Sequence, residues 1–236
     1  MRAPILITGV SQRVGLALAE HFLDRDIAVI GIYRSQRPGL QTLTRKGATL
    51  YCCDFYDDDS LEQLMITLRD NHQSLRAIIH NASDWLPEAN PLPALETLNR
   101  MMRVHVGAPY LINQALSALL SQHTQKAGDI IHITDYVADT GSKKHIAYAA
   151  SKAALHNLTL SFANLLAPLV KVNSIAPALV MFNAHDSDAY RLKAISKALI
   201  AKEGGVDEII AAANYLLDSD YITGRTLHVD GGRHLA

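Results

Sequence analysis

Three side chains in the middle of the chain could carry out acid–base chemistry together. Tyr148 and Lys152 have the spacing i, i+4, so they share one face if this stretch is helical. A nearby ammonium group favours phenolate, and we therefore expect Lys152 to lower the pKa of Tyr148 below its ordinary value of about 10. Asp135 precedes them at the end of an apolar run and completes the predicted catalytic group. The same spacing also fits a surface tyrosine beside a solvated lysine, so the surrounding elements must decide.

Short apolar runs alternate with helical patterns along the chain. The runs are rich in Ile and Val and largely lack polar alternation, which is typical of strands buried on both faces. The pattern predicts an α/β fold, a single doubly wound domain over residues 1–236 with a parallel sheet of about seven strands. Ligands bind at the carboxyl ends of such strands, which is where Asp135 is expected. The expected strands are 5–7, 27–33, 48–53, 77–80, 129–134, 170–176 and 226–229, and the expected helices are 14–25, 61–71, 95–104, 106–123, 149–166 and 206–217.

The composition narrows the class of protein. Apolar residues make up 49% of the 236 residues and charged residues 19%, which suits a folded core rather than disorder. A net charge of −1 without a long basic run predicts no nucleic-acid or membrane partner, and no apolar window reaches the roughly 18 residues of a transmembrane helix. Adjacent Cys52 and Cys53 suit a reduced, cytoplasmic protein. Residues 178–202 break the strand–helix rhythm and are predicted to form a substrate lid.

The first expected strand runs into a turn that contains glycines. Gly9 and Gly15 would let the backbone approach a pyrophosphate at the N-terminus of the next helix. Arg13 stands where a further glycine would be usual, and Val14 follows it. These four residues are predicted to bind a dinucleotide; the alternative is a glycine-rich turn without a ligand.

The end of the second expected strand indicates which dinucleotide is bound. Proteins that prefer NAD place an acidic residue there, about 20 residues after the glycine turn, to hold the ribose 2′-hydroxyl. This chain has Arg34 and Ser35 instead, and Arg34 could pair with a 2′-phosphate. We therefore predict NADPH/NADP⁺ as the cofactor, with an ordinary surface arginine as the alternative.

Two further strand ends carry candidate binding residues. Asp54 and Phe55 follow the third strand, where a carboxylate could accept a hydrogen bond from an adenine amino group; a solvated aspartate fits equally. The fourth strand leads into a polar loop that contains the only tryptophan, Trp85, which is predicted to be a flat wall for a flat ligand, although core packing is usual for tryptophan. In the same loop, the residues expected to line the cofactor cleft are Asn81, Ala82 and Ser83.

Five ordered motifs together resemble the short-chain dehydrogenase/reductase family over essentially the whole chain. The resemblance implies a Rossmann-type fold, a nicotinamide cofactor, Tyr148 as proton donor, Lys152 as the residue that holds the nicotinamide ribose, Pro177 in the cofactor site, and often a homotetramer. The motifs are Thr8-Gly9 to Gly15, Asn81-Ala82, Tyr148 to Lys152, Asn173 to Pro177, and Thr223-Gly224 to Val229-Asp230-Gly231-Gly232.

Two departures from the family pattern narrow the resemblance to the pteridine reductases. The usual serine before the tyrosine is Asp135, and the usual central glycine of the phosphate loop is Arg13. The resemblance is greatest to the bacterial enzymes that act on dihydromonapterin. It implies NADPH-dependent reduction of 7,8-dihydromonapterin to 5,6,7,8-tetrahydromonapterin, with weaker activity on dihydrofolate. The residues expected to bind this pterin are Arg13, Ser83, Trp85, Asp135 and Tyr148.

The residue types support pterin chemistry on physical grounds. Reduction of a C=N bond needs a hydride on carbon and a proton on nitrogen, which Tyr148 coupled to Asp135 could supply or relay. A carboxylate beside a developing oxyanion would be repulsive, so Asp135 argues against a simple ketone reductase. The alternatives are that Thr134 replaces the missing serine, that the substrate is a carbonyl compound, or that the chain is a non-catalytic NADP-binding sensor. His105 stands where many relatives have asparagine and is assigned no catalytic role, and no metal site is expected because the histidines are scattered.

Overall fold

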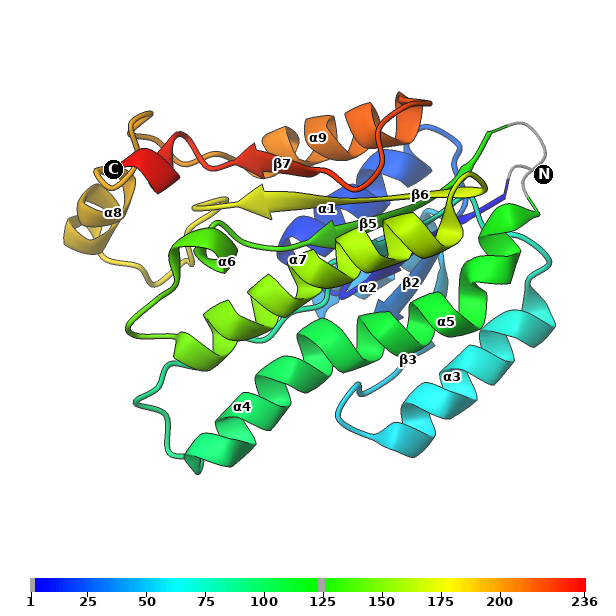
Figure 1. The fold of residues 1–236 in the computed structure, drawn as a ribbon, viewed down its shortest axis with the longest axis horizontal. Helices are drawn as coiled ribbons and strands as arrows, with labels where there is room; N and C mark the ends of the chain where they lie inside the picture. Colours follow the sequence, from blue (N-terminus) through cyan, green and yellow to red (C-terminus); the bar gives the residue numbers. More distant parts are fainter. Residues whose placement is uncertain (1–2, 123–125) are drawn as a thin grey trace.

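The apolar runs of the sequence form one parallel sheet. The computed structural model describes residues 3–122 and 126–236. Over that range seven strands pair in the order β3-β2-β1-β4-β5-β6-β7, and every pairing is parallel (Figure 1). The strands are β1 Ile5–Thr8, β2 Val29–Tyr33, β3 Thr49–Cys52, β4 Ala77–His80, β5 Gly128–Ile133, β6 Val170–Pro177 and β7 Thr226–Val229.

Helices cover both faces of the sheet, which confirms the doubly wound α/β prediction. One core places Leu61, Leu116 and Phe162 from α3, α5 and α7 against the sheet. The other packs apolar side chains of α1, α2 and α9 on the opposite face. The helices are α1 Arg13–Leu23, α2 Pro38–Arg45, α3 Asp58–Asn71, α4 Ala94–Met102, the π-helix η1 Arg103–Gly107, α5 Ala108–Ser121, α6 Val137–Thr140, α7 Ile146–Leu166, α8 Asp188–Ile195, α9 Val206–Asp218 and the 3₁₀-helix η2 Arg233–Leu235.

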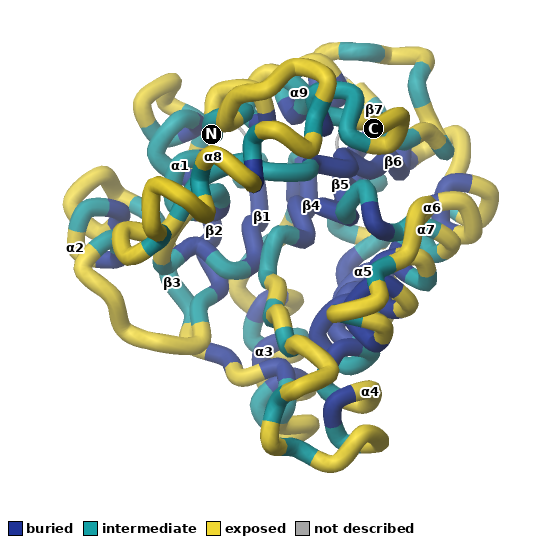
Figure 2. Tube along the Cα trace, turned by 90° about the vertical axis from the view of Figure 1, so that its left-hand side faces the viewer, coloured by how far each residue is buried: buried dark blue, intermediate teal, exposed yellow. Residues whose placement is uncertain are grey.

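The strand order reverses direction at β1, and this reversal positions the site. β1 pairs with β2 on one side and with β4 on the other, so the loops that follow β1 and β4 diverge to opposite faces. Figure 2 shows buried central strands surrounded by exposed loops. Ligands of open α/β sheets bind outside the carboxyl ends of the strands at such a switch point.

Several local features differ from the sequence prediction. Pro38 starts an additional helix, α2, and part of the 178–202 insertion is helical as α8. The two expected helices over 95–104 and 106–123 are joined by the π-helix η1, which leaves no break between α4 and α5. The expected end of the second helix at His123 lies outside the described residues.

Candidate active site

A cleft of about 1020 Å³ runs along the carboxyl ends of the strands. Loops after β1, β2, β4 and β5, the insertion after β6, and the C-terminal segment all contribute to its walls. The predicted residues that line it are Gly9, Arg13, Val14, Arg34, Ser35, Asp54, Phe55, Asn81, Ala82, Ser83, Trp85, Asp135, Tyr148, Lys152 and Pro177. Gly15 alone among the predicted residues is not part of the cleft surface, because it lies buried beneath Gly9.

The centre of the cleft brings the three predicted acid–base residues together. The Tyr148 hydroxyl donates to Asp135 Oδ2 at 2.8 Å, and Asp135 Oδ1 accepts the Val137 backbone N–H at 3.0 Å. Lys152 Nζ donates to the carbonyl of Ile133 at 2.8 Å. Tyr148 and Lys152 both lie on α7, as their spacing predicts.

Thr134 does not take the place of the missing serine. Its hydroxyl donates to the Ile175 carbonyl at 3.1 Å, within the sheet, and the residue is 2% exposed. Thr134 also borders the cleft, but its hydroxyl is bonded to Ile175, whereas the Asp135 carboxylate faces Tyr148. The arrangement puts a carboxylate, not a hydroxyl, beside Tyr148.

The pKa of Tyr148 is shifted upward, whereas the sequence predicts a downward shift. Burial raises it well above its ordinary value, and the Asp135 carboxylate raises it further. The lysine ammonium lies 5.6 Å from the centre of the tyrosine ring and is directed at the Ile133 carbonyl, so it does not overcome these two effects. Burial also raises the pKa of Asp135 and lowers the pKa of Lys152 from 10.5 to about 8. In this arrangement Tyr148 is a neutral hydroxyl donor at physiological pH.

A second hydrogen-bond chain reaches the cleft through Ser83. His105 lies between two serines, with Nε2 2.7 Å from Ser83 Oγ and Nδ1 2.8 Å from Ser151 Oγ. Ser151 donates to the Tyr148 carbonyl at 2.7 Å, so its oxygen is free to accept from His105 Nδ1. Burial holds the pKa of His105 well below its ordinary value, which keeps the ring neutral and makes Nε2 an acceptor for the Ser83 hydroxyl. His105, which the sequence left without a role, therefore fixes the orientation of Ser83.

The glycine turn is closed by Asn81. Its amide group donates to the carbonyls of Thr8 and Gly9 at 3.1 and 3.2 Å, while the Thr8 hydroxyl accepts the N–H groups of Asn81 and Ala82. A Cβ on Gly15 would come within 2.2 Å of the Gly9 carbonyl oxygen, so this position requires glycine. Asn81 thus stabilises the conformation of the glycine turn.

Arg13 has a backbone conformation that favours glycine, and its side chain contacts the insertion after β6. Its φ of 54° lies in the left-handed region. Its guanidinium donates to Asn183 Oδ1 at 2.7 Å and to the Met181 carbonyl at 2.9 Å. The side chain therefore ties the insertion to the N-terminus of α1 across the cleft.

The β2 end of the cleft is rich in cations. Arg34 and Arg37 both line it, together with Ser35. Arg34 Nη1 lies 3.5 Å from Asp84 Oδ2, and its guanidinium lies over the Tyr56 ring at 5.5 Å. Reasoning from the strand end alone missed Asp84, which reaches this corner from the loop after β4, and also Arg37, the residue before α2.

The other predicted cofactor residues have distinct surroundings. Asp54 accepts the backbone N–H of Tyr56 at 3.1 Å and is exposed, whereas Phe55 is 6% exposed and packs in the core beneath the cleft. Pro177 ends β6, and its carbonyl accepts the Tyr136 N–H at 3.0 Å. This contact joins the ends of β5 and β6 next to Asp135.

Trp85 is a wall residue and not a core residue. It is 59% exposed and stacks on His145 with ring centres 4.1 Å apart and planes 21° apart. His145 precedes α7, and its Nδ1 lies 3.2 Å from the Leu86 carbonyl. No local sequence pattern indicates this pairing, because the two rings come from separate loops.

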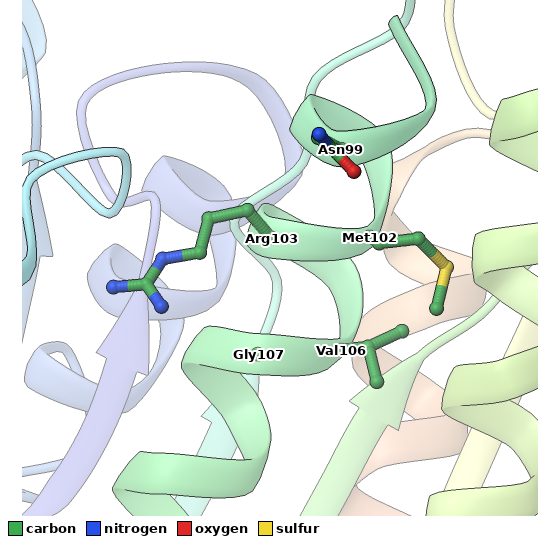
Figure 3. Close-up of a pocket in the computed structure, with 5 residues that line it drawn as sticks. All are labelled: Asn99, Met102, Arg103, Val106 and Gly107. Carbon is green, nitrogen blue, oxygen red and sulfur yellow. The ribbon is translucent and has the colours of Figure 1, made fainter. Parts of the chain in front are cut away.

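A smaller depression of about 340 Å³ lies away from the cleft, on α4 and η1 (Figure 3). Asn99, Met102, Arg103, Val106 and Gly107 line it, and none of the predicted site residues does. No cluster of three or more potential metal ligands occurs within residues 3–122 and 126–236. The described part of the chain also has no helix that is both long and apolar enough to cross a bilayer.

Comparison with known proteins places the chain in a family. A family model described as enoyl-(acyl carrier protein) reductase, from the short-chain dehydrogenases/reductases, matches residues 9–234. The chain belongs to the short-chain dehydrogenase/reductase family. This member is 53% identical over 232 residues to the dihydromonapterin reductase of Klebsiella pneumoniae, covering 98% of this chain and 97% of that protein. It is 50% identical over 232 residues to the dihydromonapterin reductase of Escherichia coli O6:K15:H31, with the same coverage.

Solved structures share the fold of this family member. An alternative dihydrofolate reductase from Brucella suis, in complex with NADP, superposes with a TM-score of 0.88 at 23% identity and covers 100% of this chain and 96% of its own. An acetoin dehydrogenase from Enterobacter cloacae also reaches 0.88, at 24% identity, with 100% and 97% coverage. These two proteins have different activities, so their similarity supports the fold of this chain, and its chemistry must be inferred from the residues of the site.

Proposed function

We propose that this short-chain reductase uses NADPH to reduce 7,8-dihydromonapterin to 5,6,7,8-tetrahydromonapterin, and that it acts more weakly on dihydrofolate. The observation that carries the proposal is the Asp135 carboxylate, 2.8 Å from the Tyr148 hydroxyl. Proteins named dihydromonapterin reductase are 50–53% identical over 232 residues, which supports the choice of substrate.

The chain has suitable groups for the cofactor. Gln12, which precedes α1, makes no side-chain capping bond, so the first N–H groups of that helix are available to a pyrophosphate. Arg34, Arg37 and Ser35 would hold the ribose 2′-phosphate at the β2 end of the cleft. Bound there, NADPH supplies the hydride.

The proton would come from the chain itself. Tyr148 is neutral, so it can donate its proton to the ring nitrogen of the reduced C=N bond. Asp135 is ionised while it accepts the Tyr148 hydroxyl, so it first takes up a proton from solvent, which its raised pKa favours. It then passes that proton to the phenolate. Tyr148 and Asp135 act in this scheme as a two-member relay that solvent refills.

Three other side chains would hold the pterin. Trp85 offers an exposed aromatic face to the flat ring, and His145 behind it fixes its orientation. Ser83, with its hydrogen committed to His105, presents an acceptor to a pterin N–H group. Arg13 would meet the polar edge of the ring if the insertion after β6, residues 178–202, moves as a lid, because its guanidinium is now bonded to that segment.

Steady-state NADPH oxidation over a panel of substrates tests the proposal. The panel contains 7,8-dihydromonapterin, dihydrofolate and a small ketone, with Tyr148→Phe as the inactive control. We expect the highest kcat/KM on dihydromonapterin and a lower value on dihydrofolate. Preference for the ketone would establish the carbonyl-reductase alternative, and NADPH binding without turnover on any substrate would establish the sensor.

We further propose a homotetramer in the cytoplasm. Exposed apolar side chains on α4, α5 and α7, among them Leu95, Tyr110 and Leu165, would be covered by neighbouring copies. The free thiols of Cys52 and Cys53 suit a reducing compartment. Light scattering after gel filtration tests the assembly, and a monomeric mass would refute it.

A further inference from the structure

One end of the cleft, beyond Tyr148, is lined by cations. They come from three segments that meet where the strand arrowheads of β5 and β6 point (Figure 1): the loop between α6 and α7, the region of α8, and the C-terminal segment. We call this group the cationic end; it consists of Lys144, Lys193, Lys197 and Arg233.

Arg233 connects the cationic end to the catalytic group. Its guanidinium lies over the Tyr136 ring at 4.8 Å and donates to the Ala194 carbonyl on α8 at 3.4 Å. Its charge also acts on the neighbouring Asp135, where it opposes the rise in pKa that burial causes. An anionic group beside Arg233 would therefore lie next to the reaction centre.

The remaining three cations are close enough to repel one another. Lys193 lies in the last turn of α8, and Lys197 follows in the turn after the helix ends at Ile195. The pKa of Lys197 is lowered, by partial desolvation and by the charges of Arg233, Lys193 and Lys144. Repulsion between like charges destabilises the folded protein, and a bound anion would relieve this repulsion.

The cationic end carries no ion pair in the part of the chain that the structure describes. Over the ranges 3–122 and 126–236, none of the four cations forms an ion pair, whereas Lys46 pairs with Asp24 and Arg103 with Asp58. Asp186 lines the same cleft but accepts the Asn183 backbone N–H at 2.8 Å. A cleft wall of one charge concentrates ligands of the opposite charge.

The cationic end is separate from the predicted 2′-phosphate site. Arg34, Arg37 and Ser35 follow β2, at one side of the sheet, whereas the cationic end lies beyond β5 and β6. Between them lie Asp135 and Tyr148. A substrate whose ring reaches Tyr148 would therefore extend its side chain toward the cationic end and away from the nucleotide.

We propose that the cationic end is an anion subsite, which binds a phosphate or carboxylate group carried on the side chain of the dihydropterin substrate. This inference rests on the proposed function, because it assigns the side chain of the same substrate. It predicts that a phosphate on the side chain makes a dihydropterin a better substrate than the same dihydropterin without the phosphate.

The test compares three substrates on the wild-type protein and on one double variant. 7,8-Dihydroneopterin 3′-phosphate carries a phosphate, dihydrofolate carries carboxylates, and 7,8-dihydroneopterin carries neither. We expect the wild type to have a higher kcat/KM on the phosphate than on 7,8-dihydroneopterin, and the advantage to shrink at high salt. The dihydrofolate arm shows whether carboxylates are bound as well, because its kcat/KM would then also fall at high salt.

The double variant Lys193→Gln/Lys197→Gln assigns the preference to these residues. Exposed charge pairs are individually weak, so removing two of them should reduce the ratio of anionic to neutral kcat/KM by about tenfold. Lys202→Gln is the matched control, since Lys202 is an exposed lysine of the same insertion that does not line the cleft. It should leave the ratio unchanged.

Two results would overturn the inference. The first is an equal or lower kcat/KM on 7,8-dihydroneopterin 3′-phosphate than on 7,8-dihydroneopterin in the wild type, a comparison that needs no variant. The second is a double variant that loses activity on all three substrates by the same factor. If no dihydropterin is reduced at all while NADPH binds, the proposed function itself fails, and that outcome is distinct from both.

Discussion

Replacing Lys152 with methionine is expected to stabilise the fold and abolish turnover. Lys152 is 2% exposed, and its ammonium donates to the Ile133 carbonyl at 2.8 Å. Burial lowers its pKa from 10.5 to about 8, which means that the charged form costs about 3 kcal/mol in the folded state. Methionine removes this cost, but the lost hydrogen bond to the Ile133 carbonyl offsets about 1 kcal/mol of the stabilisation. We therefore expect the variant to be more stable by about 2 kcal/mol at pH 7, equivalent to roughly 4–8 °C in Tm.

The free energy of unfolding should depend on pH in a direction that follows from the pKa of Lys152. The folded-state pKa of Lys152 lies below the unfolded value, so the unfolded chain binds more protons between about pH 8 and pH 10.5. The free energy of unfolding of the wild type therefore rises with pH over that window. The methionine variant lacks this rise, and its advantage should disappear near pH 10.5. Urea unfolding of both proteins at pH 7 and pH 10 measures the difference.

Lys171→Met is the matched control, because it makes the same chemical change at another buried lysine. Lys171 Nζ contacts Asp129 Oδ1 at 2.6 Å, in a buried triad with Arg76. Removing one partner of a buried ion pair typically costs about 3–5 kcal/mol, so this variant should be destabilised. The reasoning is refuted if Lys152→Met also destabilises the protein at pH 7, or if its gain is as large at pH 10 as at pH 7.

Two further predictions concern ligand binding. Arg34→Asp should weaken NADPH binding by tenfold or more and shift preference toward NADH, because a half-exposed partner of the 2′-phosphate becomes a repulsive carboxylate. Titration of the variant with each cofactor measures the two affinities, and an unchanged NADPH affinity would show that Arg34 is not part of the site. Trp85→Ala should raise the KM for dihydropterin by tenfold or more, since stacking on an aromatic ring contributes about 1–3 kcal/mol. Tm and NADPH affinity should stay nearly constant because Trp85 is 59% exposed, and a lower Tm with a normal KM would contradict this.

The fold was largely predictable because buried parallel strands have a simple sequence signature. The expected strands at Ala77–His80 and Thr226–Val229 agree with the structure at both ends, and the remaining five differ by a few residues. The helices α2 and α8 were missed because they are short, eight residues each, and rich in polar residues. The π-helix was missed because a single extra residue per turn leaves the apolar pattern of α4 and α5 almost unchanged.

The members of the site were more predictable than their interactions. Strand ends and motifs indicated Asp135, Tyr148 and Lys152, and the structure brings these three together. The direction of the Tyr148 pKa was wrong, because it depends on burial and on where the ammonium points, and neither is encoded in the i, i+4 spacing. The contact of Arg13 with Asn183 likewise joins segments far apart in the chain, so no local signal could reveal it.

The catalytic role of Asp135 is the central claim, and the pH profile of one variant tests it most directly. Turnover of 7,8-dihydromonapterin is measured from pH 5 to pH 9 for the wild type and for Asp135→Ser, with NADPH saturating and a small ketone as the second substrate. We expect Asp135→Ser to reduce dihydropterin turnover by roughly 10²–10⁴-fold, to lose the titration that belongs to the Asp135–Tyr148 pair, and to gain weak activity on the ketone. Wild-type turnover of dihydromonapterin by Asp135→Ser, with an unshifted pH profile, would contradict the account.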